Sequence, residues 1–194
     1  MSTTCPALSN SPSWPLRLIA SLCLIFILVA APGPASATGP NDLDRLFEDL
    51  KNAQEETAAR AIEDTIWRAW LDQAPDSETR QLIDKAMSRR EQYDFEGARL
   101  LLNEAIERSP DYSEGWNQRA FILFLQGELD SALEDVDRAL ELEPRHFGAL
   151  SGKALILMQQ GRVELGQKAL REAVALHPFL KERHMLIEPK GTDL

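Results

Sequence analysis

The chain repeats one pattern every 34 residues. Three prolines, Pro110, Pro144 and Pro178, mark the period, and each follows a stretch in which small side chains occupy three matching positions. The small residues are Ala86, Ala120 and Ala154, then Ala98, Ala132 and Gly166, then Ala105, Ala139 and Ala173. Because Ala and Gly make up only about a sixth of an ordinary chain, nine small residues in matched positions indicate an internal repeat.

Each repeat is expected to hold two helices joined by a tight turn. The middle unit predicts helices over 113–126 and 129–142, with Gly127 at the end of the first helix. Glycine favours the left-handed conformation that ends many helices, and Gly161 stands 34 residues further on. The proline after each second helix cannot continue it. We expect the small side chains to let neighbouring helices approach closely, since a leucine in their place would overpack the contact.

Helix-turn-helix units of this period are typical of tetratricopeptide repeats (TPR), and the middle unit resembles that family in the most positions. Its matching residues are Trp116, Ala120, Gly127, Ala132, Ala139 and Pro144. The departures from the family pattern are Leu82 and Tyr93 in the first unit, Arg119 and Leu123 in the second, and Leu150 and Gly166 in the third. The resemblance covers about residues 79–180 and implies an all-α TPR solenoid, a right-handed superhelix. An unrelated helical bundle is the alternative.

The pattern divides the chain into six segments. They are a signal peptide (1–37), a degenerate N-terminal helical hairpin (38–78), three repeats (79–112, 113–146 and 147–180), and a capping helix with a polar tail (181–194). A terminal unit of a solenoid is atypical because one of its faces has no neighbouring repeat. We therefore expect Trp67 and Trp70 of the N-terminal hairpin to be buried against the first repeat. Residues 180–187 are predicted to form a last amphipathic helix.

Residues 1–37 have the features of an export signal. They carry one charged side chain, Arg17, followed by an apolar run at 18–31 and by small residues at 35–37. The run is shorter than the ~18–20 residues that span a bilayer, and the small residues suit cleavage between Ala37 and Thr38. We expect a periplasmic protein with no stable membrane span after cleavage; an uncleaved N-terminal anchor is the alternative. Both cysteines, Cys5 and Cys23, lie in this signal, so the mature chain would have no thiol.

Composition and spacing argue against several kinds of chemistry. Asp and Glu total 31 against 21 Lys and Arg, and the resulting net charge of −10 does not favour binding to nucleic acid. His146, His177 and His184 lack the three- or four-residue spacing of a helical zinc site, and no glycine-rich phosphate loop occurs. His146 and His177 stand near the repeat-closing prolines and are predicted to be turn residues. We expect no enzymatic activity, cofactor, metal or small-molecule substrate; an enzyme would need paired acids on the concave face.

The acidic side chains of the second helix in the middle unit are predicted to face solvent. They are Glu128, Asp130, Glu134, Asp135 and Asp137. Pairing with Arg138 across one helical turn is the ordinary role of such residues on an exposed helix face.

By resemblance to TPR arrays, the first helix of each unit would line a concave groove. This geometry selects ten residues: Ile83, Met87, Arg90, Glu114, Asn117, Phe121, Phe124, Ser151, Leu155 and Met158. Met and aromatic side chains form adaptable surfaces, so we expect the groove to bind an extended segment or a helix of another protein at about micromolar affinity. Phe124 and Asn117 are the preferred candidates. The alternative for Met87, Phe121 and Leu155 is simple packing between the first helices.

Chaperone-binding TPR domains hold a ligand carboxylate with Lys, Asn and Arg, and this chain lacks those residues at the matching positions. The positions hold Ile83, Met87, Gln118, Gly148 and Gly152. The order of signal, Trp-rich hairpin and three repeats is similar to that of small exported TPR proteins of alphaproteobacteria. This resemblance implies a non-enzymatic periplasmic scaffold or adaptor, linked to envelope integrity or assembly. The alternative is a homo-oligomeric structural envelope protein that uses the same face.

Overall fold

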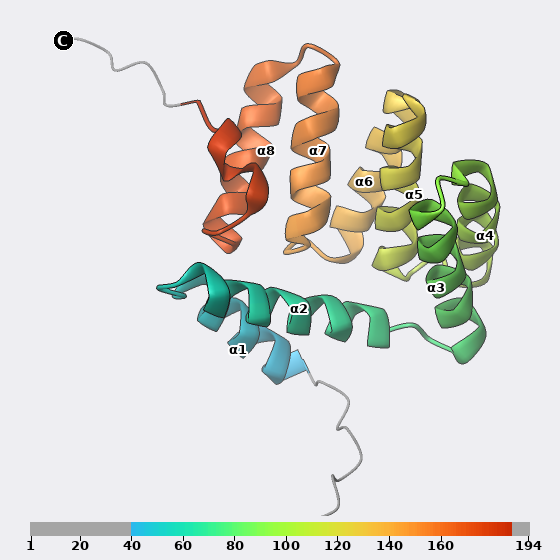
Figure 1. Cartoon of the computed structure of the whole chain (residues 1–194), viewed down its shortest axis with the longest axis horizontal. Helices are drawn as coiled ribbons and strands as arrows, with labels where there is room; N and C mark the ends of the chain where they lie inside the picture. Colours follow the sequence, from blue (N-terminus) through green and yellow to red (C-terminus); the bar gives the residue numbers. More distant parts are fainter. Residues whose placement is uncertain (1–39, 188–194) are drawn as a thin grey trace, which may run out of the picture. The chain divides into compact units, whose positions relative to one another are not determined.

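The computed structural model describes residues 40–187, which form eight α-helices and one short 3-10 helix (Figure 1). The helices are α1 (Pro40–Lys51), α2 (Glu56–Asp72), α3 (Ser77–Glu91), α4 (Phe95–Arg108), α5 (Ser113–Gln126), α6 (Leu129–Leu142), α7 (Phe147–Gln159), α8 (Val163–Leu176) and the 3-10 helix η1 (Lys181–Met185). The predicted signal peptide at 1–37 lies outside the described residues. Within those residues no helix combines the length and apolar character needed to cross a membrane.

Three successive helical hairpins, α3–α4, α5–α6 and α7–α8, carry the 34-residue repeat. The second helices begin in register at Phe95, Leu129 and Val163. In Figure 1 the hairpins stand side by side, and each second helix contacts the first helix of its own hairpin, while α4 contacts α5 and α6 contacts α7. The described part of the chain therefore has the expected all-α solenoid architecture.

The small residues of the repeat lie where the helices meet, as predicted. All nine are buried, and the eight alanines are at most 1 % exposed. Gly166 shows how close the approach is: a Cβ there would lie 2.6 Å from Met158 Cγ and 2.8 Å from the Ala154 carbonyl oxygen. These distances are far below van der Waals contact, so α8 can reach α7 only because position 166 has no side chain.

The turn inside each hairpin places one residue in the left-handed region. Gly127 and Gly161 have φ angles of 80° and 78°, as the sequence predicted for helix-ending glycines. The first hairpin has Tyr93 at the same repeat position, with φ at 62°. A bulky side chain is strained in this region, so Tyr93 makes the first turn less stable than glycine would, although the backbone keeps the same conformation.

Arg119, another departure from the family pattern, is explained by a partner on the next helix. Its guanidinium group donates two hydrogen bonds of 2.7 and 2.8 Å to Asp135 and a third to Asn103. Asp135 is 4 % exposed, so the prediction that it faces solvent is wrong. Arg119 thus joins α5 to α6 through Asp135 and to α4 through Asn103.

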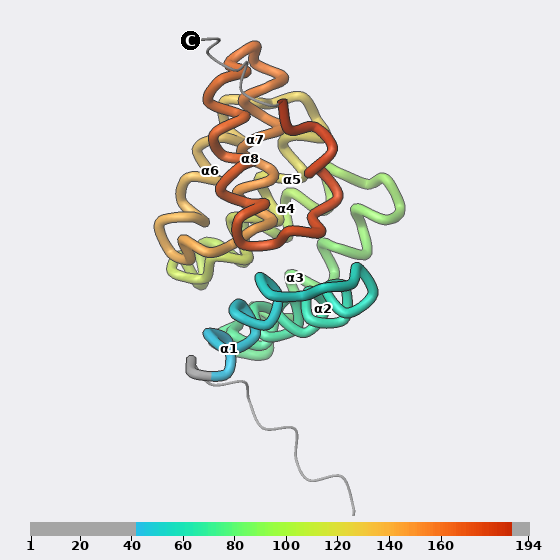
Figure 2. The backbone as a smooth tube through the Cα atoms, turned by 90° about the vertical axis from the view of Figure 1, so that its left-hand side faces the viewer, coloured from blue at the N-terminus to red at the C-terminus, as the bar shows by residue number. Residues whose placement is uncertain are grey.

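The N-terminal hairpin α1–α2 does not stack on the first repeat as an extra unit. In Figures 1 and 2 it lies across one end of the three hairpins, and α1 contacts α8. Trp70 is fully buried, but its ring stacks at 4.0 Å on His146, the N-cap residue of α7, and packs at 5.0 Å on Phe147 of α7. The predicted burial of Trp67 and Trp70 against the first repeat is therefore wrong.

Apolar contact continues along the junction between the N-terminal hairpin and the third repeat. One buried cluster joins Leu43, Phe47, Leu50, Ile66 and Trp70 to Phe147, Leu150, Leu170 and Leu180. The end of α2 also contacts the first repeat, where the Tyr112 hydroxyl shares its donated hydrogen bond between the carbonyl oxygens of Trp70 and Leu71.

Charged groups also fasten α2 to the third repeat. Glu63 accepts a 2.7 Å hydrogen bond from Arg60 and lies 3.1 Å from the Nε2 atom of buried His177, while Arg60 also donates to the Phe179 carbonyl. Burial acts to raise the pKa of Glu63, but the hydrogen bonds from His177 and Arg60 outweigh it and lower the pKa from 4.5 to about 2. The ionised form of Glu63 therefore stabilises the docked hairpin.

The C-terminal segment is shorter and tighter than predicted. Instead of an amphipathic α-helix over 180–187, one 3-10 turn covers Lys181–Met185. Leu180 is buried in the cluster under α2, and the carbonyl of Met185 and the N–H of Ile187 both bond to the Gln167 side chain. These contacts fix the segment against α8 and leave it no room to extend as a regular helix.

The substitution Gly166→Ala should lower the free energy of unfolding by about 1–3 kcal/mol, because the added methyl group meets the backbone of α7. Gly152→Ala is the matched control on α7, since a Cβ there meets only Val136 Cγ2 at 3.8 Å. The control should be neutral or stabilising by up to about 1 kcal/mol, the usual gain in helix propensity. Urea unfolding measures both changes. Equal effects of the two substitutions would contradict the close approach of α7 and α8.

The substitution Glu63→Gln should cost about 1.5–3 kcal/mol of stability at about pH 5, because it removes hydrogen bonds to a charged group. The folded-state pKa lies below the ordinary value, so this stabilisation is present above about pH 4.5 and is lost as the pH falls through about 2. The stability difference between wild type and variant should therefore shrink in acid. Urea unfolding at several pH values tests this, with Asp64→Asn on the exposed side of α2 as control. A difference that does not change with pH would count against the docking contact.

Candidate functional site

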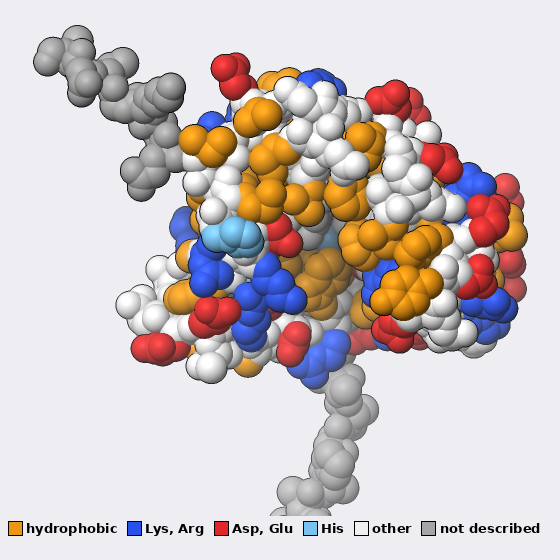
Figure 3. Space-filling model, turned by 45° about the horizontal axis from the view of Figure 1, so that its top comes forward, with side chains coloured by type: hydrophobic (Ala, Val, Ile, Leu, Met, Phe, Trp, Pro, Cys, Tyr) orange, Lys and Arg blue, Asp and Glu red, His pale blue; other side chains and the backbone are white. Residues whose placement is uncertain are grey.

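A cavity of about 290 Å³ lies on the inner side of the first helices α3, α5 and α7. Side chains of α2 and of the C-terminal segment close it from other directions: Glu63 and Trp67 from α2, and Leu180, Lys181 and Glu182 after α8. In Figure 3 hydrophobic side chains gather around a hollow in this face, with charged groups along part of its rim. The cavity is therefore a partly open pocket that is bordered by three parts of the fold.

Six of the ten predicted groove residues line this cavity. They are Arg90, Asn117, Phe121, Phe124, Ser151 and Leu155. Phe121 is 44 % exposed, whereas Asn117 and Ser151 are buried, at 8 % and 6 % exposed. The structure brings these residues together from α3, α5 and α7.

The other four predicted residues do not line the cavity. Ile83 is fully buried in the core of the first repeat, and Met87 packs against the same core. Glu114 is fully buried beneath the cavity wall. Met158 packs against the third repeat, and its sulfur accepts a 3.4 Å contact from Gln167. Fewer residues of each first helix face the cavity than predicted. These four side chains pack between helices instead.

Part of the α7 face toward the cavity carries only small residues. Gly148, Ser151 and Gly152 follow one another along it. A Cβ on Gly148 would lie 2.8 Å from the Trp67 ring, so this glycine lets α2 approach α7 closely. Gly152 has no such neighbour and leaves open space. The small residues thus create the volume of the cavity, and aromatic residues from α2 and α5 give it apolar walls.

A chain of polar contacts runs behind the wall of the cavity. Arg90 donates to the Gln118 side-chain oxygen at 2.9 Å, and the Gln118 amide nitrogen donates to Glu114 Oε1 at 2.6 Å. Glu114 Oε2 lies 2.9 Å from His146 Nε2, and His146 Nδ1 accepts from the backbone N–H of Ala149. Glu114 and His146 are both fully buried, so each needs these partners to offset the cost of leaving water.

The sequence did not reveal this role of His146, which was predicted to be a turn residue. His146 caps the start of α7, as a turn residue can, but it also contacts α5 and stacks on Trp70 of α2. One signal in the sequence could have indicated this role: His146 occupies the same position of the repeat as Tyr112 and Leu180. All three residues are buried, so this column belongs to the core of the stack.

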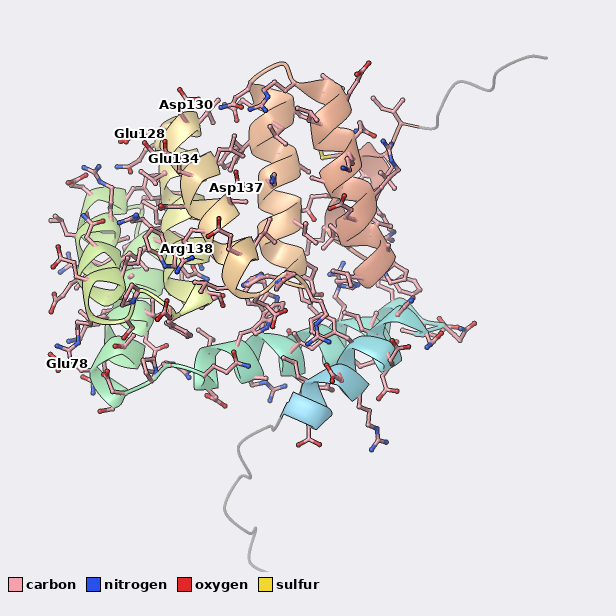
Figure 4. The ribbon with its side chains drawn as sticks, turned by 180° about the vertical axis from the view of Figure 1, so that it is seen from behind. Glu78, Glu128, Asp130, Glu134, Asp137 and Arg138 are labelled. Atoms are coloured by element: carbon pink, nitrogen blue, oxygen red, sulfur yellow. The ribbon has the colours of Figure 1, made fainter. Side chains whose placement is uncertain are left out.

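The predicted exposed carboxylates of α6 lie mostly as expected. Figure 4 shows Glu128, Asp130, Glu134 and Asp137 along the outer side of this helix, away from the cavity. Arg138 pairs across one turn with Glu141 and not with the predicted carboxylates, and it also pairs with Asp111 in the loop between α4 and α5. Among residues 42–187 no group of three His, Cys, Asp or Glu side chains has the arrangement of a metal site.

Comparison with known proteins agrees with this architecture. The family model described as tetratricopeptide repeat matches residues 113–146. A TPR repeat-containing protein of Rhizobium etli is 35% identical over 175 residues, which cover 82% of this chain and 84% of that protein. Tetratricopeptide repeat protein 36 of Xenopus tropicalis is 32% identical over 146 residues, covering 73% and 70% of the two chains.

Two solved structures have the same fold. The first TPR of Spaghetti (RPAP3) bound to the HSP90 peptide SRMEEVD has a TM-score of 0.55 at 18% identity and covers 58% of this chain and 90% of that one. The Sgt2 TPR domain from Aspergillus fumigatus has a TM-score of 0.51 at 19% identity and covers 62% and 91%. The predicted TPR solenoid is confirmed, and so is the resemblance to a TPR protein of an alphaproteobacterium. The chain belongs to the tetratricopeptide repeat family.

Proposed function

We propose that this protein is a non-enzymatic scaffold that holds a segment of another protein in the cavity between α3, α5, α7 and α2. The observation that carries the proposal is the cavity itself, whose aromatic walls and small α7 residues leave apolar surface uncovered on the inner side of the repeats. Uncovered apolar surface rimmed by polar groups marks interaction sites in soluble proteins.

A related fold gives the proposal further support. The RPAP3 domain was solved with a peptide of HSP90, so a TPR fold of similar extent is able to hold a short polypeptide. The ligand of this chain should differ, because Ile83, Met87, Gln118, Gly148 and Gly152 replace the polar residues of a carboxylate clamp. We propose an internal segment with large apolar side chains as the ligand, bound at about micromolar strength.

The place of action belongs to the same proposal. Residues 1–37 have the composition of a secretory signal, and we propose cleavage before Thr38 and a role in the periplasm, in envelope integrity or assembly. Cell fractionation followed by N-terminal sequencing tests this. A mature chain that begins at Thr38 in the periplasmic fraction agrees with the proposal, and an intact N-terminus in the cytoplasm contradicts it.

A photo-crosslinking amino acid placed at Phe121 should capture a partner in intact cells, whereas the same group at Leu100 should not. Leu100 is the matched control because it is 59 % exposed but lies on α4, away from the cavity.

Phe124→Ala should weaken capture about tenfold, equivalent to about 1.4 kcal/mol, while the protein stays folded by circular dichroism. Ala132→Leu should instead loosen the stack by about 1–3 kcal/mol. Equal capture from positions 121 and 100 would contradict the proposal.

A further inference from the structure

Arg90 presents an unneutralised cation to the cavity. It lies in the last turn of α3, is half-buried, and lines the cavity wall. No carboxylate of the described residues lies within ion-pair distance of it. Its contacts are the 2.9 Å hydrogen bond to the neutral Gln118 side chain and the face of the Phe121 ring, 5.3 Å from the guanidinium carbon. A guanidinium has five N–H donors, so most of them remain available to a ligand.

The lack of an acidic partner is unusual in this chain. Acidic side chains outnumber basic ones by 31 to 21, and most arginines of the described part pair with a carboxylate. The arginines without such a pair on the outer surface, such as Arg171, are exposed to solvent, which screens their charge. Arg90 is half-buried in a pocket with aromatic walls, where an opposite charge would be screened much less and would interact more strongly.

The surroundings of Arg90 fix its position. Glu114 accepts a hydrogen bond from the Gln118 amide nitrogen, so the Gln118 oxygen must face Arg90. Both Glu114 oxygens are occupied, one by Gln118 and the other by His146, and Glu114 reaches Arg90 only through Gln118. The guanidinium is therefore held in place between Gln118 and the Phe121 ring before any ligand binds.

We propose that Arg90 binds the side-chain carboxylate of an Asp or Glu residue in the bound segment, with apolar residues of that segment filling the space over Gly152. This deepens the proposed function by naming the ligand class: an apolar internal segment of another protein that carries one acidic side chain at a fixed position. The side chain is preferred to a terminal carboxylate because the cavity is partly open and Phe121 beside Arg90 is exposed, so a bound backbone has room to continue past Arg90.

Selection from random 12-residue peptides displayed on phage tests this assignment, with the protein purified from cells as the target. One library presents the peptides without a free C-terminus and a second presents them with one. Wild type should enrich Asp or Glu at one position relative to apolar residues, in both libraries. Arg90→Glu should lose at least tenfold affinity for those peptides and select Lys or Arg at the same position. Arg90→Gln should lose the acidic preference without gaining a basic one.

Arg171→Glu is the matched control, since it makes the same change in net charge on the exposed outer side of α8. It should leave the selected sequences unchanged, and circular dichroism should show that all variants fold.

Enriched peptides without an acidic preference, or with one that survives Arg90→Glu, would overturn the assignment of Arg90 and leave the proposed function standing. Enrichment confined to free C-termini would overturn the choice of a side-chain carboxylate. If Gly152→Leu, which fills the cavity, retained every selected peptide, both proposals would fail.

Two further measurements would show whether the cavity holds something other than a separate protein. Removal of residues 188–194 that raised peptide affinity tenfold would assign the cavity to the chain's own C-terminal segment. A mass of two chains by light scattering, reduced to one by Arg90→Glu, would assign it to a second copy. Either result would overturn the proposal of a separate protein as the ligand.

Discussion

The packing of Trp70 between the first hairpin's helices and the third repeat determines the form of the concave face. The Trp70 ring is fully buried, lies parallel to the His146 ring at 4.0 Å, and contacts Phe47 and Phe147. Its indole N–H has no hydrogen-bond partner among the described residues, so Trp70 holds the junction by apolar burial and ring stacking, beside the charged contacts of Glu63 and Asp44. Truncation of a buried aromatic side chain of this size to alanine costs about 3–5 kcal/mol of stability. Trp70 therefore contributes strongly to holding the hairpin across the stack.

The docked α2 changes what the repeats present to a partner. A terminal unit that stacked before the first repeat would lengthen the solenoid and leave its inner side open. Here α2 crosses to α7, where Trp67 fits against Gly148 and borders the pocket on the inner side of the repeats. His146 connects these parts, because it caps α7, stacks on Trp70 and bonds to Glu114 of α5. A fully satisfied buried polar network of this kind favours one arrangement of the helices over others.

The repeat architecture was predictable because its signals are local and periodic. Ala132, Gly166 and their equivalents specify close helix contacts wherever the 34-residue register holds, and Gly127 and Gly161 mark the turns. The docking of the N-terminal hairpin was not predictable in this way. It depends on pairs such as Glu63 and His177, which are 114 residues apart and belong to no periodic pattern. The same reason explains the site: Phe121, Phe124 and Leu155 were selected by the resemblance to TPR arrays, whereas the burial of Glu114 depends on His146, which is 32 residues away at the start of α7.

The position of α1–α2 is the central claim, and a distance measurement tests it most directly. Asp44 of α1 bonds to Arg145 before α7 at 2.6 Å, so these two positions are adjacent across the docked junction. Spin labels on cysteines introduced at 44 and 145, with Cys5 and Cys23 replaced by serine, can be measured by electron paramagnetic resonance. The account predicts a single short separation that broadens when Trp70 is replaced by alanine. A long or broad separation in the otherwise unchanged protein would show that the hairpin is not docked on the third repeat.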